Sequence, residues 1–331
     1  MPSIFTASLT TIRRQEADLE SEEIKTVTVV GTGIIGSSWT CLFLAHGLDV
    51  VATDIREGAE AALESAVARL WSSLPENVVA TGRRGKLRFS ADLEAACEGT
   101  DFVQENAIER LDAKIELMRR IDAVTPANVV IASSSSAISV SEMQAACSHP
   151  ERVVLGHPFN PVHLVPLVEL SGGARTAEAA LMQAQAFYTR LGKVPVRLEK
   201  EVYGHIANRL QAAIFREAIH LLESGVASAE DIDRAVTEGP GARWALMGPF
   251  LTYHLAGGEK GMKGFWEMFA PMQDRLWGDL GSPVPDAALQ ARVTDAVESA
   301  YGDRSLDALV EDRDSRLRQV LAIKSSKAGS P

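Results

Sequence analysis

Over its first two hundred residues the chain alternates short apolar runs with longer stretches in which apolar residues recur at helical spacing. The short runs predict strands near residues 25–30, 48–53, 87–89, 102–105, 128–132, 152–155, 164–170 and 194–198. The longer stretches predict helices over 37–46, 56–74, 111–124 and 176–191, and a further helix that begins at Asp92, whose carboxylate can cap it. Strands and helices that alternate in this way predict a doubly wound α/β sheet.

The pattern changes after residue 200, where only helical periodicity remains. It predicts helices over 202–224 and 228–238, the second capped by Ser228, and several more after Gly257-Gly258. No internal repeat is visible. We therefore expect an N-terminal extension over residues 1–23, the doubly wound sheet domain over 24–200, and an all-helical domain over 201–331.

A glycine-rich turn joins the first predicted strand to the first predicted helix, in the order Gly31-Thr-Gly33-Ile34-Ile35-Gly36. Gly31 allows a tight turn, Gly33 lets the backbone approach a pyrophosphate, and Gly36 lets the helix pack on the strand. The free N–H groups of the first helical turn then face the phosphates. Strand, turn and helix in this order predict a Rossmann-type dinucleotide-binding domain.

The second predicted strand ends at Asp54, about 20 residues after the first glycine of the turn. A carboxylate at this position accepts hydrogen bonds from both ribose hydroxyls and repels a 2′-phosphate. The sequence therefore predicts NAD rather than NADP as the cofactor, provided that Arg56 does not turn in to reverse the preference.

Composition sets the outer limits on function. With 331 residues and 46% apolar side chains, the chain is long enough to build two cores. The formal charge of −11 argues against nucleic acid or an anionic membrane surface as a partner. The three cysteines lack metal-ligand spacing, and no apolar run approaches the length of a membrane span. We therefore expect a cytoplasmic protein in a reducing compartment.

Polar residues that suit acid–base chemistry follow the glycine turn in the sequence. Ser133–Ser136 close a predicted strand, at the sheet edge where ligands bind in such folds. His157 and Glu169 lie twelve residues apart, and Asn208 follows in the helical part. Taken singly, each has a structural alternative: a packed histidine, a loop, or the polar face of a helix. A metal pair of His157 with His163 lacks a third ligand at suitable spacing, so we expect no metal.

The ordered set of motifs resembles the L-3-hydroxyacyl-CoA dehydrogenase family. The resemblance covers about residues 25–255 and rests on GTGIIG with Asp54, NAIERLDAK (106–114), SSSSAI (133–138), GHPFNP (156–161) with Glu169, and NRL (208–210). Segments 239–262 and 304–317 are most similar to the bacterial branch that oxidises L-carnitine, and less so to the L-gulonate 3-dehydrogenase and lambda-crystallin branch.

The resemblance implies catalytic roles for four side chains. His157 would be the general base that takes the hydroxyl proton, and Glu169 would hold its imidazole in the right tautomer. Ser136 and Asn208 would hydrogen-bond the reacting oxygen. The family commonly has Asn-Thr or Ser-Thr where this chain has Ser134-Ser135, so the choice among the serine hydroxyls stays open.

The resemblance also places residues around the cofactor. Glu109 and Lys114 would approach the nicotinamide ribose, and Asn160 would lie near the nicotinamide. This assignment agrees with elementary chemistry, since oxidising a secondary alcohol needs a hydride acceptor and a proton acceptor at one carbon. An imidazole, whose ordinary pKa is near 6.5, suits the second task at neutral pH.

Substrate recognition is expected in the helical domain. Arg243 can clamp a free carboxylate in a bidentate fork, and aromatic faces suit a quaternary ammonium group. The aromatic residues concentrated after it are Trp244, Phe250, Tyr253, Phe265 and Trp266. They form either a cation cage or simply a core or subunit contact.

We expect NAD-dependent oxidation of L-carnitine. The alternatives are 3-hydroxybutyryl-CoA or L-gulonate as the substrate, and a non-catalytic crystallin-like protein is disfavoured by the complete set of catalytic side chains. The resemblance further implies a homodimer.

Overall fold

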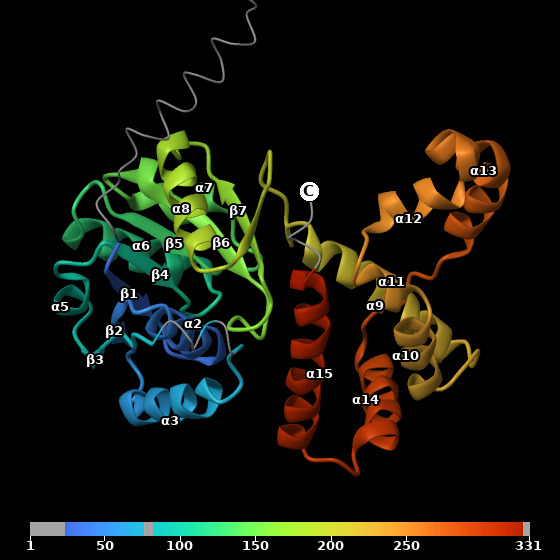
Figure 1. Cartoon of the computed structure of the whole chain (residues 1–331), viewed down its shortest axis with the longest axis horizontal. Helices are drawn as coiled ribbons and strands as arrows, with labels where there is room; N and C mark the ends of the chain where they lie inside the picture. The colour runs from blue at the N-terminus through green and yellow to red at the C-terminus, as the bar shows by residue number, and fades with distance from the viewer. Residues whose placement is uncertain (1–23, 76–77, 79–81, 327–331) are drawn as a thin grey trace, which may run out of the picture. The chain divides into compact units, whose positions relative to one another are not determined.

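The computed structural model describes residues 24–75, 78 and 82–326. The chain divides into two compact units between Ile206 and Ala207, and each is described by itself (Figure 1). The predicted extension over residues 1–23 lies outside the described residues. The domain boundary predicted after residue 200 stays a prediction.

One mixed sheet organises the first unit, and this confirms the predicted fold class. Within the described residues its strands run in the order β3-β2-β1-β4-β5-β6-β7-β8, and all neighbours are parallel except β6 and β7. The strands are β1 (Thr26–Val30), β2 (Asp49–Thr53), β3 (Leu87–Phe89), β4 (Phe102–Glu105), β5 (Val130–Ser133), β6 (Val153–Pro158), β7 (Leu167–Gly172) and β8 (Val194–Arg197).

Helices cover both faces of this sheet. One face carries α2 (Ile34–Ala45), α3 (Ala59–Trp71) and α8 (Glu178–Arg190), and the other carries α5 (Leu93–Cys97), α6 (Leu111–Val124) and α7 (Val140–Met143). Because side chains alternate along a strand, Val27 and Val29 of β1 enter the first core while Val30 enters the second. In the first core Trp39 is fully buried and stacks on Phe43 at 5.2 Å, a pair that contributes about 0.5–1.5 kcal/mol beyond area burial.

The sequence prediction is wrong for the last residues of the first unit. A helix was expected from residue 202, but α9 covers Ala207–Glu223. The cause is backbone conformation: Gly204 and His205 have φ angles of 74° and 52°, in the left-handed region that no right-handed helix allows. The residues before Ala207 instead form a segment that is fixed to the sheet unit.

The second unit is helical, as predicted. Its helices are α9, α10 (Ala229–Glu238), α11 (Pro240–Trp244), α12 (Pro249–Ala256), α13 (Gly261–Asp279), α14 (Ala287–Tyr301) and α15 (Leu306–Ser326). The predicted cap is present, since the Ser228 hydroxyl accepts from the backbone N–H of Asp231 at 3.1 Å. A short 3-10 helix lies at Gly258–Lys260, and two others lie in the first unit, at Gln144–Ala146 and Pro150–Arg152. None of the described helices combines the length and apolar content needed to cross a membrane.

Candidate active site

The glycine turn between β1 and α2 has the geometry of a phosphate cradle. Gly31 has a φ of 84°, and a Cβ there would lie 2.9 Å from the backbone nitrogen of Ala107. A Cβ on Gly36 would lie 1.9 Å from the carbonyl oxygen of Gly31, so the helix can approach the turn only with glycine here. A Cβ on Gly33 would meet nothing within 4 Å. The turn therefore presents open backbone next to the first N–H groups of α2, which Ile34 and Ile35 begin, and these residues fit a dinucleotide pyrophosphate.

Asp54 follows β2 beside the glycine turn and is already engaged by hydrogen bonds. It accepts from the backbone N–H of Thr32 at 2.7 Å, and from Arg56 Nε at 3.0 Å and Nη2 at 2.9 Å. Burial acts to raise the pKa of Asp54, but the hydrogen bonds from Arg56 and Thr32 hold it well below its usual range. Asp54 is thus anionic at neutral pH, and Arg56 does turn toward it.

Each of the four serines that begin at the last residue of β5 has its own partner. The serine cluster therefore forms an ordered turn, in which only the last hydroxyl faces the histidine. The pairs join Ser133 to Glu105 at 2.6 Å, Ser134 to Asn106 Oδ1 at 2.7 Å, Ser135 to Glu109 at 2.5 Å, and Ser136 to His157 Nε2 at 3.1 Å.

The Glu109 side chain holds this turn by accepting hydrogen bonds from the turn's backbone N–H groups. Its Oε1 accepts from the N–H groups of Ser136 and Ala137, each at 2.9 Å. Burial acts to raise the pKa of Glu109, but the Ser135 hydroxyl, the backbone donors and Lys114 lower it overall. The carboxylate thus stays ionised and anchors the residue whose side chain faces His157.

A buried ion pair between Lys114 and Glu105 lies next to Glu109. The Lys114 side chain is 1% exposed, and its Nζ lies 2.8 Å from Oε1 of the fully buried Glu105 and 3.8 Å from Glu109. Lys114 therefore contacts both carboxylates, and its shorter contact is with Glu105. Sequence reasoning missed Glu105, although an acid that closes the buried strand Phe102–Glu105 needs a partner.

His157 and Glu169 are direct neighbours across β6 and β7. The antiparallel register pairs the two residues, and His157 Nδ1 lies 3.0 Å from Glu169 Oε2. Because a carboxylate only accepts, Nδ1 carries the ring hydrogen and Nε2 presents its lone pair toward Ser136. A Cβ on the preceding Gly156 would lie 2.1 Å from the Tyr188 hydroxyl, so glycine is what lets β6 pack against α8 here. The arrangement can take a proton from an alcohol at Nε2 and stabilise the resulting imidazolium.

The remaining predicted residues are less closely connected to this pair. Asn160 is exposed just after β6 and joins Pro161 through a cis peptide bond. Asn208 lies in the first turn of α9, in the helical unit. The structure therefore brings Ser136, His157 and Glu169 together, while Asn208 is described within the other unit.

The predicted substrate-binding residues also belong to the helical unit. Arg243 and Trp244 close the short helix α11, and Phe250 and Tyr253 lie on α12. The Tyr253 ring packs on Phe265 at 4.8 Å between centroids, and Phe265 is 4% exposed. Phe265 is therefore a packing residue, whereas Phe250 is 83% exposed.

Two further side chains near the site were not expected from the sequence. The His205 ring lies 4.9 Å from the His157 ring, and the helix predicted over 202–224 had concealed it. Lys193 is buried, and its Nζ donates to the carbonyls of Val162 and Val165, in the loop after Asn160. Burial lowers the pKa of Lys193 to about 7.

The structure also bears on metal binding. The two ring nitrogens of His163 lie 2.8 Å from the hydroxyls of Ser38 and Ser73. Among residues 24–75, 78 and 82–326, no group of three or more His, Cys, Asp and Glu side chains is placed to hold a metal ion. The cysteines in the same ranges, Cys41, Cys97 and Cys147, are free and buried.

Comparison with known proteins places this site in a family. Residues 26–202 match the family model for the 3-hydroxyacyl-CoA dehydrogenase NAD binding domain, and residues 204–295 match that for its C-terminal domain. The chain is 46% identical to an L-carnitine dehydrogenase of Pseudomonas putida, covering 92% of this chain and 96% of that protein. It is 44% identical to an L-carnitine dehydrogenase of Streptomyces griseus, covering 96% and 95%.

Among solved structures, a 5-formyl-3-hydroxy-2-methylpyridine 4-carboxylic acid 5-dehydrogenase, described as an NAD⁺-dependent dismutase, is similar with a TM-score of 0.78. Its sequence identity is 27%, and the match covers 93% of this chain and all of that one. The fold, the glycine turn and both family matches agree with one another. The chain belongs to the 3-hydroxyacyl-CoA dehydrogenase family, whose N-terminal domain binds NAD.

Proposed function

We propose that this protein oxidises the 3-hydroxyl group of L-carnitine to give 3-dehydrocarnitine, with NAD as the hydride acceptor. One observation carries the chemistry: His157, Glu169 and Ser136 lie in a single hydrogen-bonded row on an NAD-binding domain. The choice of substrate is supported by relatives named L-carnitine dehydrogenase, which match nearly the whole chain at 44–46% identity.

The proton path follows from the hydrogen-bond directions. Glu169 fixes the hydrogen of His157 on Nδ1, so Nε2 is free to accept the proton of the substrate hydroxyl. The C–H hydrogen leaves as hydride and the hydroxyl hydrogen leaves as a proton, so the alcohol becomes a ketone. The charge that develops on His157 is stabilised by the buried carboxylate behind it. The Ser136 hydroxyl lies 3.1 Å from Nε2 in the structure, and once the substrate hydroxyl takes its place at Nε2, Ser136 would donate to the reacting oxygen; we assign Asn208 the same role.

The residues around the glycine turn fit the cofactor. When bound, NAD supplies a nicotinamide ring that accepts the hydride. Gly31, Gly33 and Gly36 shape the turn for the pyrophosphate, and Asp54 would accept from the adenosine ribose hydroxyls. Farther along the sheet edge we assign Asn160 to the nicotinamide. Glu109 would approach the nicotinamide ribose directly, and Lys114 would act through Glu109 because its ammonium is buried against Glu105.

We assign the two charged ends of the substrate to the helical unit. Arg243 would clamp the carboxylate, since a guanidinium binds carboxylates in bidentate fashion. Trp244, Phe250 and Tyr253 would supply aromatic faces for the trimethylammonium group. Kinetics with Arg243→Lys and Tyr253→Ala test this assignment, and each should raise the KM for carnitine. An unchanged KM removes that residue from the binding site.

A substrate panel tests the proposed function as a whole. The purified protein is assayed for NADH formation with L-carnitine, D-carnitine, L-gulonate and 3-hydroxybutyryl-CoA, and with NADP in place of NAD. We expect the highest kcat/KM with L-carnitine and NAD, and loss of turnover in His157→Asn. A higher kcat/KM with the thioester or with gulonate overturns carnitine as the substrate and leaves the reaction type intact.

We also propose that the protein works in the cytoplasm as a homodimer formed by its helical unit. This unit carries several large apolar side chains at the surface, such as Phe215 at 59% and Trp277 at 60% exposure. Light scattering during gel filtration measures the mass, and a monomeric mass at assay concentration contradicts the dimer.

A further inference from the structure

The segment between β8 and α9 contains a residue in a costly backbone conformation. His205 has a φ of 52°, in the left-handed region that residues other than glycine seldom adopt. It is also 5% exposed, so it is not a surface turn residue. Such conformations persist where the surrounding contacts hold them and cluster at functional sites. The contacts of His205 are therefore informative.

The His205 ring links two parts of the proposed active site. Its Nε2 lies 3.1 Å from the carbonyl oxygen of Ser135, the residue before Ser136, and its ring centroid lies 4.9 Å from that of His157. Because a carbonyl only accepts, Nε2 carries the hydrogen. Burial lowers the pKa of His205 and the nearby His157 lowers it further, against the opposing effects of Ser135, Glu169 and Glu109, so the ring is neutral at physiological pH.

The residue after His205 contacts the other half of the pair. The backbone N–H of Ile206 donates to Glu169 Oε1 at 2.8 Å, while Oε2 of the same carboxylate holds His157. Two consecutive residues therefore contact the base, the acid and the serine turn. Both contacts depend on the left-handed turn at His205, because it sets the direction of the chain into Ile206.

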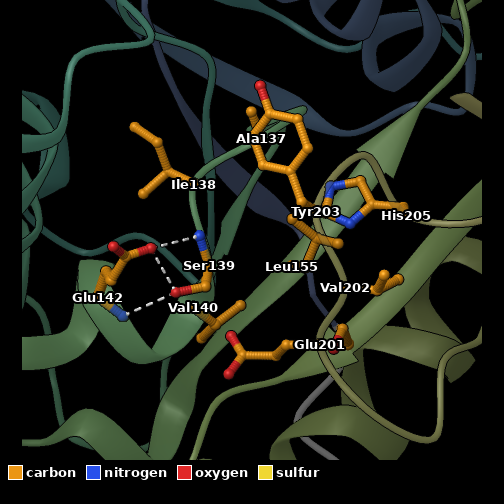
Figure 2. A pocket seen from close by; sticks show the side chains of 11 residues that line it. Ala137, Ile138, Ser139, Val140, Glu142, Leu155, Glu201, Val202, Tyr203 and His205 are labelled. Carbon is orange, nitrogen blue, oxygen red and sulfur yellow. Dashed lines mark hydrogen bonds between the residues drawn. The ribbon is translucent and has the colours of Figure 1, made fainter. Parts of the chain in front are cut away.

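His205 also lines a cavity of about 210 Å³ (Figure 2). Its walls include Ala137, Ile138, Leu155, Tyr203 and His205, most of them apolar. His157 itself does not line this cavity. His205 therefore contacts both the imidazole of the proposed base and this cavity.

We propose that His205 is a positioning residue for the His157–Glu169 pair. Its ring keeps the His157 imidazole turned toward Ser136, and its left-handed backbone places the Ile206 amide against Glu169. This inference rests on the proposed function only in that His157 is taken as the base.

The test removes the ring while keeping the backbone. His205→Gly adopts a positive φ without strain, so it should fold, and His205→Asn keeps a polar side chain that tolerates this conformation. We expect His205→Gly to lower kcat by about 100-fold, because small misplacements of a reacting group have effects of this size, with the KM for NAD changed by less than about twofold. His205→Asn should fall in between. His149→Asn, at a half-exposed histidine elsewhere in the same unit, is the matched control and should leave kcat unchanged.

A second measurement separates this inference from the proposed function. Histidine NMR with isotope-labelled protein reports the tautomer of His157 in wild type and in His205→Gly. We expect a single Nδ1–H tautomer in wild type and a mixture in the variant. An unchanged tautomer population overturns the positioning role whatever the activity. A changed population with unchanged kcat supports the positioning role and shows that His157 is not the base, which is a failure of the proposed function.

Discussion

Replacing Glu169 by glutamine removes one charge from behind the base with almost no change in shape. The carboxylate is 1% exposed and lies 3.0 Å from His157 Nδ1. Two unit charges about 4 Å apart interact by about 4 kcal/mol at an effective dielectric constant of about 20. Glutamine keeps a hydrogen bond worth about 1 kcal/mol, so the imidazolium loses about 2–3 kcal/mol of stabilisation. We therefore expect kcat to fall by about 30- to 200-fold.

The assay is steady-state NADH formation across pH, together with thermal unfolding and NAD binding of the same preparations. Glutamine offers one oxygen where Glu169 accepts from both His157 and Ile206, so one of these donors then faces an amide NH₂. Glu169→Asp keeps the charge on a shorter side chain and should lose less activity than Glu169→Gln. A folded Glu169→Gln variant with kcat within about threefold of wild type refutes the reasoning, because the charge would then have no part in catalysis.

Three further outcomes follow from the contacts of single side chains. Lys114→Met leaves the buried Glu105 carboxylate without a cation, so the free energy of unfolding measured in urea titrations should fall by about 3–5 kcal/mol. Adding Glu105→Gln to this variant should restore part of the loss. A smaller loss, or no restoration, contradicts the stabilising role of the buried pair. Asp54→Ser removes the carboxylate that repels a 2′-phosphate and releases Arg56 from its hydrogen bonds. The kcat/KM for NADP divided by that for NAD should therefore rise by about 10- to 100-fold. An unchanged ratio would show that Asp54 does not select the cofactor. Lys193 has a pKa of about 7 in the folded protein and 10.5 in the unfolded chain, so between these pH values the unfolded state binds more protons. The free energy of unfolding should therefore rise with pH in this range. Unfolding titrations at about pH 7 and about pH 10 should show this rise in wild type and a smaller one in Lys193→Met.

Features that depend on local sequence were predictable. The glycine turn and Asp54 were found because the backbone demands glycine at fixed spacings and the acid ends the next strand. The fold class followed from the alternation of strands and helices. Ser136, His157 and Glu169 were expected in one site, and their side chains lie within hydrogen-bonding distance. Their catalytic roles stay predictions.

Features that depend on packing between distant segments were not predictable. His205 was read as part of a helix because periodicity carries no information on φ, and the contact with Ser135 spans seventy residues. The pairing of Lys114 with Glu105 joins a helix to a strand end, which spacing alone does not indicate. No sequence pattern singled out Lys193, and only the fold shows that its ammonium donates to the loop after β6.

His157 and Glu169, the proposed base and its acid, are register partners in the antiparallel pair of β6 and β7, so the backbone pairing of these strands sets their separation. Changes in the length of the connection between these strands would leave this spacing intact as long as the register holds. A slip of one rung is different, since it would turn the acid to the opposite face of the sheet and offer the imidazole Val168 or Leu170 instead. The contact between His157 and Glu169 therefore requires that the register of β6 and β7 be kept.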